Sequence, residues 1–463
     1  MIQVTPLCRP KLDPDFVPAA LWNQAYRSAA AESPSHRNVK IAIARPDGLT
    51  WIYHTRLLPH SEAFEAATYH YCERIVKFLL WAWGGSSVLI SNAPEVVEQL
   101  QQAYAPKGAR AFDHGFMGLT CFDQDFSIDQ AEDHELLEVL PKSTGGLGSL
   151  KGNRLGFDLG GSDRKCAAMI DGKVVFSEEI KWNPYFETDP QYHRAGIQDS
   201  LERAAAHLPS IDGIGGSAAG IYINNEPRVG SLYRGISQED FQKSIRPLFK
   251  ELQANWNQVP FELANDGDVT AMAGAMAIQD NAVLGVSMGT SFAAGYINPA
   301  GSVTGWLNEL AFVPVDYRAG VALDEWSGDH GCGVQYFSQQ GVGRLLPLSG
   351  IELDDRLGLP EKLEIVQAKM AEGDHRAHAI YSTIGTCFGY SIAHFAEFYD
   401  FRHLLFLGRV SSGQGGEVIM NEARRVLDLE FPELSKRITF QTPDEKTKRH
   451  GQAIAAATLP KID

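Results

Sequence analysis

Residues 154 to 162 read Arg-Leu-Gly-Phe-Asp-Leu-Gly-Gly-Ser, an apolar run that ends at an aspartate followed by two glycines. Apolar runs also fill Lys165–Ile170 and Lys173–Ile180, and the pair Asp171-Gly172 stands between them. An Asp-Gly pair between two such runs is a strong signal of a β-hairpin. We therefore expect three consecutive strands, with a glycine-rich turn after the first.

The turn after the first strand has the residue types that a phosphate site needs. Gly160 and Gly161 let backbone N–H groups approach an anion, and the Ser162 hydroxyl can donate to a phosphate oxygen. Asp158, at the end of the strand, can hold a hydrated Mg²⁺. A plain hairpin turn shows the same short pattern, so this stretch alone leaves both interpretations open.

A candidate catalytic carboxylate lies in residues 263–268, Leu-Ala-Asn-Asp-Gly-Asp, directly before the small helix formers of Val269–Met276. This order places Asp266 at a helix entrance, with its carboxylate free to point into a cleft. An alcohol that attacks ATP needs a base to take its proton, and a carboxylate suits a loose phosphoryl-transfer transition state. The alternative is that Asn265, Asp266 or Asp268 is a helix N-cap.

A second set of strand, turn and strand follows. Ala282–Val286 and Phe292–Ile297 are apolar runs, and small and hydroxyl residues stand between them. The arrangement repeats that of the first turn and would hold phosphates from the opposite side. The candidate phosphate-binding residues of this turn are Gly289, Thr290 and Ser291.

The last candidate segment follows an apolar strand, His403–Leu407, and precedes a helix expected over Glu417–Val426. Its glycines allow the close approach of an adenosine ring and ribose, whereas the alternative is a long helix-entry loop. The candidate adenosine-binding residues are Gly408, Ser411, Ser412 and Gly413.

In this order and spacing, the four segments resemble the phosphate-1, catalytic, phosphate-2 and adenosine motifs of the hexokinase and ROK branch of the actin-like ATPase superfamily. The resemblance covers residues 154–463 and implies an α/β fold of two ribonuclease-H-like lobes around a cleft. The first lobe would run over about 154–265 plus the C-terminal helix, and the second over about 266–446. A small extra α/β domain would precede them.

The same resemblance implies a function, which is transfer of the γ-phosphoryl group of MgATP to a hydroxyl of a sugar or sugar derivative. Asp266 would be the general base, Asp158 the partner of Mg²⁺, and Asn265 a ligand of a sugar hydroxyl. ATP and Mg²⁺ would be the cofactors, and closure of the lobes would exclude water from the transfer. A homodimer is the assembly to test.

The segments that correspond to the sugar-binding motifs of the family depart from the family pattern. The expected Gly-Glu-x-Gly-His segment corresponds to Asn308–Phe312, in which Glu309 remains as a candidate hydroxyl acceptor and the histidine is absent. The usual Pro-Gly of the sugar loop corresponds to Ser217 and Ala218. The predicted substrate-binding residues are therefore Asn265, Glu309, Ser217 and Ala218, and the identity of the sugar stays open.

Zinc is not expected. The closely spaced cysteines of the family are reduced to Cys332, and one thiol with the neighbouring His330 cannot supply a four-ligand structural site. The six cysteines of the chain are scattered without a CxxC pair, which also argues against a disulfide framework.

The composition is that of an ordinary globular chain of two or three domains, with 463 residues, 44% of them hydrophobic and 21% charged. A formal net charge of -16 opposes binding to nucleic acid or to an anionic membrane surface, and no basic patch offsets it. The N-terminus lacks the continuous apolar run of a signal peptide. We therefore expect a cytoplasmic protein with no nucleic acid or membrane partner.

A domain boundary is predicted at residues 143–152, which are small and flexible and follow an acidic run. This divides the chain into an N-terminal α/β domain of unknown role at 1–142, a Gly/Ser linker at 143–153 and the kinase-like part at 154–463. The elements expected in the N-terminal domain are a hairpin over Val39–Leu58, an amphipathic helix over Ser61–Trp83, a strand over Ser87–Ser91 and a helix over Ala93–Tyr104.

Two other nucleotide-binding motifs are not supported by the sequence, but a second function remains an alternative. Gly213–Ala218 fits GxGxxA, yet Gly220–Ile223 after it has the pattern of a strand instead of the helix of a dinucleotide site. No GK[ST] follows Gly415-Gly416, as a Walker loop requires. Because ROK proteins include regulators, a non-catalytic sugar- or nucleotide-binding regulator or scaffold is the alternative to an active kinase.

Overall fold

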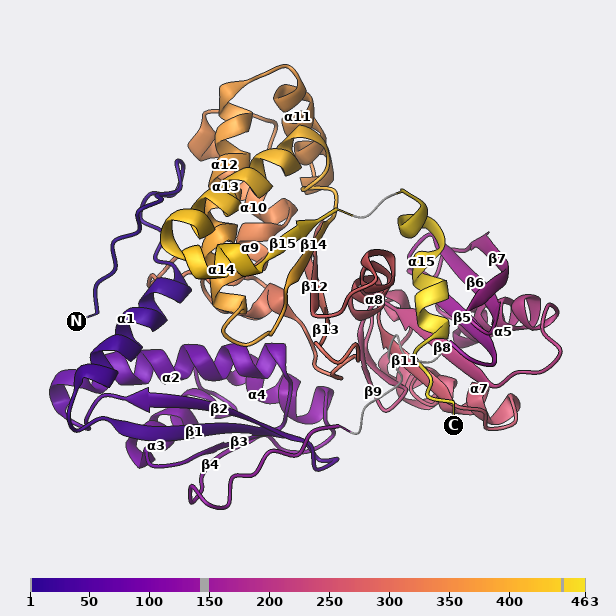
Figure 1. The fold of residues 1–463 in the computed structure, drawn as a ribbon, viewed down its shortest axis with the longest axis horizontal. Helices are drawn as coiled ribbons and strands as arrows, with labels where there is room; N and C mark the ends of the chain where they lie inside the picture. The colour runs from indigo at the N-terminus through magenta and orange to yellow at the C-terminus, as the bar shows by residue number, and fades with distance from the viewer. Residues whose placement is uncertain (1, 142–149, 443–444, 463) are drawn as a thin grey trace.

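The computed structural model describes residues 2–141, 150–442 and 445–462. Figure 1 shows an N-terminal part in indigo and violet, a first lobe in magenta and a second lobe in orange. The end of the chain returns to the first lobe as helix α15 (Glu445–Ala457). The predicted 143–153 linker falls largely outside the described residues, so the division into domains at that point stays a prediction.

The N-terminal part contains a sheet in the order β2-β1-β3-β4 with helices packed on it. The predicted hairpin, long helix, strand and second helix are confirmed, each within one or two residues of its expected bounds. The elements are α1 (Ala19–Glu32), β1 (Arg37–Ala44), β2 (Thr50–Leu57), α2 (Glu62–Ala82), β3 (Ser87–Ile90), α3 (Pro94–Ala103), α4 (Ala111–Gly115) and β4 (Ser127–Gln130).

Helix α2 differs from its prediction in one respect. An amphipathic helix leaves one face in water, yet every residue of α2 from Tyr71 to Ala82 is buried. The reason is visible in Figure 1, where α2 lies between its own sheet and the second lobe. Its C-terminal half is therefore an internal helix of the whole molecule.

The first lobe is built on a sheet in the order β7-β6-β5-β8-β11. Asp171 and Gly172 both have positive φ, 48° and 79°, as a two-residue type I′ hairpin turn requires. Strands β5, β8 and β11 are parallel, so their C-terminal ends meet at one edge of the sheet. The lobe comprises β5 (Asn153–Leu159), β6 (Asp163–Ile170), β7 (Lys173–Lys181), α5 (Pro190–Ala205), β8 (Gly213–Ala218), β9 (Ile221–Ile223), β10 (Glu226–Val229), α7 (Leu248–Asn255) and β11 (Phe261–Asn265).

The second lobe repeats this arrangement with the sheet β13-β12-β14-β15, in which β12 and β13 form the hairpin and β14 and β15 run parallel to β12. The predicted α/β class with ribonuclease-H-like lobes is thereby confirmed. The principal elements are α8 (Asp266–Ile278), β12 (Val283–Met288), β13 (Phe292–Ile297), α10 (Gln339–Ser349), α11 (Leu359–Ala371), α12 (His375–Phe395), β14 (His403–Leu407), α13 (Gly413–Glu430), α14 (Pro432–Arg437) and β15 (Thr439–Gln441).

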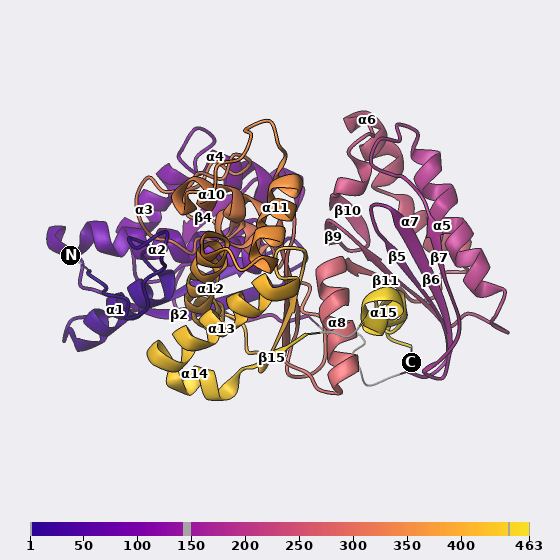
Figure 2. The ribbon, with the colours of Figure 1, turned by 90° about the horizontal axis from the view of Figure 1, so that it is seen from above.

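Helices α8 and α15 lie side by side between the two sheets (Figure 2). Helix α8 packs on β12 and β13, and α15 packs on β5 and β8. The backbone of α15 approaches the sheet so closely that a Cβ at Gly156 or Gly215 would lie within 2 Å of a carbonyl oxygen of the helix, 1.9 Å and 1.7 Å respectively. The last turn of the chain is thus part of the first lobe.

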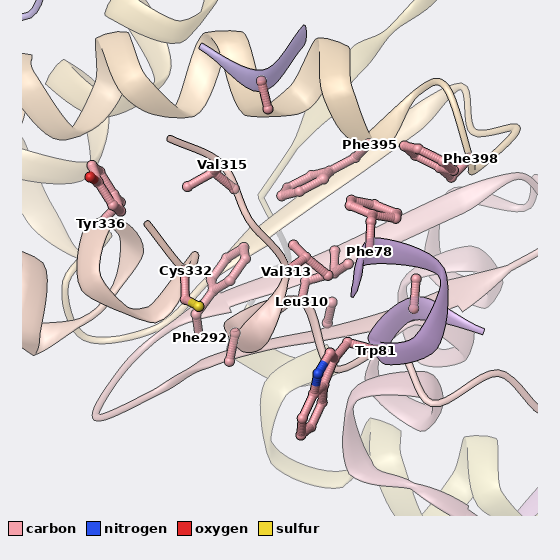
Figure 3. Close-up of a cluster of buried hydrophobic side chains, with 14 of the residues drawn as sticks. Phe78, Trp81, Phe292, Leu310, Val313, Val315, Cys332, Tyr336, Phe395 and Phe398 are labelled. Atoms are coloured by element: carbon pink, nitrogen blue, oxygen red, sulfur yellow. The ribbon is translucent and has the colours of Figure 1, made fainter. Parts of the chain in front are cut away.

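One hydrophobic core runs through the N-terminal part and the second lobe, whereas the first lobe has a core of its own. Figure 3 shows the join, where Phe78 and Trp81 of α2 interleave with second-lobe side chains. The Phe78 ring stacks on Phe398 with centroids 3.9 Å apart, and Trp81 meets Phe312 at 4.6 Å. The N-terminal part and the second lobe therefore share one closely packed interior.

Candidate functional site

The predicted base, Asp266, is the first residue of α8, at the edge where the parallel strands of the first lobe end. The preceding residue supplies the N-cap, because Asn265 Oδ1 accepts a hydrogen bond from the Gly267 N–H at 2.7 Å. The Asn265 amide also donates to the Gly220 carbonyl at 2.7 Å. Asn265 therefore fixes the helix entrance, and Asp266 is left to line a cavity.

Asp266 is one of four acidic side chains at the site whose pKa values are raised, the others being Asp158, Asp268 and Glu309. Burial and the negative charge of Asp158 raise the pKa of Asp266 to about 6. Burial also raises the pKa of Asp268 to about 7, although Asp268 accepts from the Tyr296 N–H at 2.9 Å and from Asn308 Nδ2 at 2.7 Å. Burial, followed by the charges of Asp266 and Asp268, raises the pKa of Glu309 to about 7. Clustered carboxylates with raised pKa values are typical of catalytic sites.

The predicted Mg²⁺ partner, Asp158, is buried at the end of β5 and already has two partners. Ser217 Oγ donates to its Oδ1 at 2.6 Å, and Lys165 Nζ lies 3.4 Å from its Oδ2. Burial raises the pKa of Asp158 above its ordinary value despite the Lys165 charge. Lys165 was not predicted, yet the hairpin register pairs it directly with Asp158, so the sequence contained the signal.

Two predicted substrate ligands have no side-chain surface at the site. Ser217 and Ala218 are both 0% exposed, and the Ser217 hydroxyl is directed to Asp158. We call the backbone from the last residue of β8 to Gly220 the β8 loop (residues 218–220). Its Gly220 carbonyl holds the Asn265 amide, which connects the loop to the helix that carries the base.

The first predicted phosphate turn is a tight turn between β5 and β6. The Gly160 N–H donates to the Asp163 carbonyl at 2.9 Å, and Gly161 lies against the ring of Tyr185. The Ser162 hydroxyl is exposed and donates to Asp163 Oδ2 at 2.8 Å, so that hydrogen bond would have to be exchanged for one to a phosphate. The structure thus places these residues beside Asp158, at the same edge of the sheet.

The other two predicted nucleotide segments are neighbours on the second lobe. Thr290 and Ser291 are exposed in the turn that begins at Gly289. Gly408 has a φ of 107°, and a Cβ there would lie 2.3 Å from the Met288 carbonyl oxygen at the end of β12. The Val410 N–H donates to the same oxygen at 2.9 Å. The adenosine segment, in which Ser411 and Ser412 bond to nearby carbonyls and Gly413 begins α13, therefore lies directly against the second phosphate turn.

A cavity of about 310 Å³ connects the catalytic and adenosine segments. Asp266 lies in its wall with Gly408, and the remaining wall comes from α8, β12, β13, β14 and Gln452 of α15. Among the described residues that line it, none belongs to the two phosphate turns. The cavity therefore extends from Asp266 to Gly408 along the second lobe and reaches the first lobe through Gln452 of α15.

The residues present fit a magnesium nucleotide better than a metal held by protein alone. No group of three or more His, Cys, Asp and Glu side chains suited to a metal occurs within the described residues. Mg²⁺ in nucleotide sites is bound by one or two carboxylates together with phosphates, and Asp158 provides one such carboxylate. Lys165 would then pair with phosphate oxygens in place of Asp158.

The N-terminal part contributes to the site in a way that the sequence did not predict. The Glu309 and Asn308 N–H groups donate to the Trp81 and Ala82 carbonyls at 3.0 Å and 2.9 Å. Trp81 and Ala82 end α2, and the last carbonyls of a helix have no partner within it. Helix α2 therefore fixes the backbone that carries the Glu309 carboxylate.

The sequence matches no protein-family model and no curated protein. In the described part of the chain, no helix is both long and apolar enough to cross a bilayer.

Similar solved structures identify the fold of the two-lobed part of the chain. A ROK hexokinase from Thermus thermophilus is similar with a TM-score of 0.52 and 16% identity, covering 67% of this chain and 98% of that one. A ROK family glucokinase from Streptomyces griseus, solved with glucose and AMPPNP, has a TM-score of 0.47 and 19% identity over 67% and 99%. A ROK family transcriptional regulator, a homologue of the E. coli MLC protein, has a TM-score of 0.49 and 16% identity, covering 66% of this chain and 78% of that one. The first likeness carries the conclusion: the two-lobed part of the chain has the fold of a ROK sugar kinase, an actin-like ATPase fold.

Proposed function

We propose that this protein transfers the γ-phosphoryl group of MgATP to a hydroxyl of a sugar or sugar derivative, with Asp266 as the general base. The observation that carries the proposal is the position of Asp266 at an inter-lobe cavity, next to Asp158 and with the adenosine segment in the same cavity wall. The fold shared with a hexokinase supports a sugar as the acceptor.

The chain's own residues supply three parts of such a reaction. Asp266, ionised above pH 6, takes the proton of the attacking hydroxyl. Glu309 accepts a hydrogen bond from a second hydroxyl and orients the acceptor ring. Lys165 and the backbone N–H group at Gly161 meet the phosphates, whose transfer depends on positioning and charge. When bound, Mg²⁺ would neutralise phosphate charge from the side of Asp158.

The test is ADP release from MgATP across a panel of sugars and sugar derivatives, repeated with Asp266→Asn. We expect turnover with at least one acceptor and a loss of 10² to 10⁴-fold in the variant, in the range of general-base catalysis, with ATP binding retained. Asp355→Asn, an exposed second-lobe carboxylate, is the matched control and should keep full activity. An acceptor that works equally well with Asn at 266 would remove the base assignment.

The alternative is a non-catalytic regulator or scaffold that binds nucleotide or sugar. The observation that favours it is the engagement of Asp158 by both Ser217 and Lys165, which gives each oxygen of its carboxylate a partner within the protein. ATP binding without turnover on any acceptor would decide for this alternative. The cytoplasmic location and the homodimer stay predictions.

A further inference from the structure

The N-terminal part is joined to the second lobe by charge as well as by its core. Three cations, Arg74, Lys77 and Arg110, meet three anions, Glu73, Asp113 and Asp329, and Asp329 is the member from the second lobe. Arg74 Nη1 lies 3.1 Å from Asp329 Oδ2, and both side chains are buried. These contacts make the N-terminal part a rigid extension of the second lobe.

This extension also reaches the first lobe. Asp123 of the N-terminal part pairs with both Arg228 and Arg246 of the first lobe. The Arg228 side chain is 8% exposed and also pairs with Glu226 at 3.1 Å. Asp123 has a φ of 58°, so its backbone adopts a conformation uncommon outside glycine in order to present this carboxylate.

The first-lobe partner of Asp123 is the hairpin of β9 and β10. Arg228 belongs to β10, and Ile221 and Ile223 of β9 are members of the core shared by the N-terminal part and the second lobe. The hairpin begins immediately after the β8 loop, and Gly230 at its other end lies against the Ala219 carbonyl. Fixing the hairpin therefore fixes the β8 loop.

The two sides of the acceptor region are thus held by the same body. Helix α2 fixes Glu309 on the second lobe, and Asp123 fixes the hairpin that carries the β8 loop on the first lobe. The Gly220 carbonyl of this loop holds the Asn265 amide, one residue from Asp266. A change in the position of the hairpin would accordingly change the position of Asp266.

We propose that Asp123 is a positioning residue, through which the N-terminal part holds the first lobe in register with Glu309 and so sets the geometry of the acceptor site. Asp123 is too far along the chain of contacts to touch a substrate, and acts through Arg228, Arg246 and the hairpin. Its effect on kinetics rests on the proposed kinase function, whereas its effect on the hairpin does not.

The experiment is amide hydrogen exchange of the hairpin, residues 221–229, in Asp123→Asn and in the matched control Asp125→Asn. Asn tolerates the left-handed backbone of residue 123, so the first variant removes only the charge. Asp125 is exposed and forms no ion pair with any residue the structure describes. We expect hairpin exchange about fivefold faster in Asp123→Asn and unchanged in Asp125→Asn, with β5 unchanged in both.

A second variant, Arg246→Gln, removes the charge on the other side of the ion pair. The proposal can then be refuted even if a substitution at residue 123 affects only the backbone around it. Arg246→Gln should accelerate hairpin exchange too, and combining it with Asp123→Asn should add less than the product of the two effects. Equal exchange in the Asp123 and Asp125 variants, or full additivity with Arg246→Gln, overturns the proposal.

Steady-state kinetics distinguish a failure of this positioning role from a failure of the proposed kinase function on which it rests. With an active acceptor, Asp123→Asn should raise the acceptor KM about fivefold and leave the KM for ATP unchanged, whereas a general loss of folded protein would lower kcat alone. An equal rise of both KM values overturns the positioning role. If no acceptor is phosphorylated, the proposed function fails, and the exchange experiment still decides whether Asp123 holds the hairpin.

Discussion

At the scale of single residues, the charge state of Asp266 is set by its burial and by the neighbouring Asp158 carboxylate. Burial and Asp158 raise its pKa to about 6, so Asp266 becomes protonated as the pH falls through 6. A protonated carboxyl cannot take a proton from an attacking hydroxyl. The acceptor kcat/KM should therefore fall about tenfold per pH unit below pH 6.

A pH–rate profile from pH 4.5 to 9 in a constant ionic strength buffer checks this prediction. Lys165→Met should move the acid limb upward, because losing a cation beside Asp158 leaves more negative charge near Asp266. An acid limb at about 4, the ordinary value for an aspartate, would contradict the coupling of the carboxylates.

Some site residues could be predicted from the sequence and others could not. Asp266 could, because an acid before small helix formers marks a helix entrance. The orientation of Ser217 and Ala218 could not, because all of β8 is buried and its two faces show no alternation of polar and apolar residues. The support of Glu309 by α2 joins segments far apart in the sequence, which no local pattern records.

At the scale of elements, the end of β12 and the loop after β14 depend on the glycine at 408. Its φ of 107° disfavours any side chain, and a Cβ would collide with the backbone of Met288 instead of a movable side chain. Gly408→Ala should therefore cost about 3 kcal/mol or more of stability, or force the two loops apart and abolish nucleotide binding.

Gly413→Ala is the matched control, because Gly413 also has a positive φ, 65°, but no atom lies within 4 Å of an added Cβ. It should cost about 1 kcal/mol through backbone strain alone. Urea unfolding of both variants measures the difference in stability, and nucleotide titration of Gly408→Ala measures its loss of binding. Equal losses would show that the contact between the two loops contributes nothing.

Most elements were predictable where a turn signal coincided with a regular spacing of apolar residues. Examples are the hairpin at Asp171-Gly172 and the helix at Ser61–Trp83. The period of α2 could not reveal its burial. Its second half contains Lys77, whose pKa burial alone would lower, but the charges of Asp113 and Asp329 outweigh burial and raise it. A buried lysine is recognised from its partners, and one of these lies in the second lobe.

At the scale of the whole molecule, the buried ion pairs of α2 tie two bodies together. Asp329→Asn keeps the size of the side chain and leaves Arg74 and Arg110 without one of their anions. Because Arg74 is buried and Arg110 is only 15% exposed, the variant should lose about 3 to 5 kcal/mol of unfolding free energy. Urea denaturation followed by tryptophan fluorescence measures it.

Asp354→Asn is the control at this scale, since Asp354 pairs with Arg356 at 2.6 Å but the arginine is 90% exposed. An exposed pair contributes little, so the control should change stability by less than about 0.5 kcal/mol. A small effect at Asp329 would mean that the shared core alone joins the N-terminal part to the second lobe.

The position of α15 on the first lobe has a consequence for biosynthesis. The strands β5 and β8 are translated long before the helix that covers Gly156 and Gly215, and Arg154 Nη1 donates to carbonyls at Ala457 and Pro460. While the ribosome is still elongating the chain, the first lobe has an uncovered apolar face, a state in which nascent chains aggregate or recruit chaperones. Loss of the codons for α15 would therefore damage a lobe whose strand β5 carries Arg154, 303 residues before its partner Ala457.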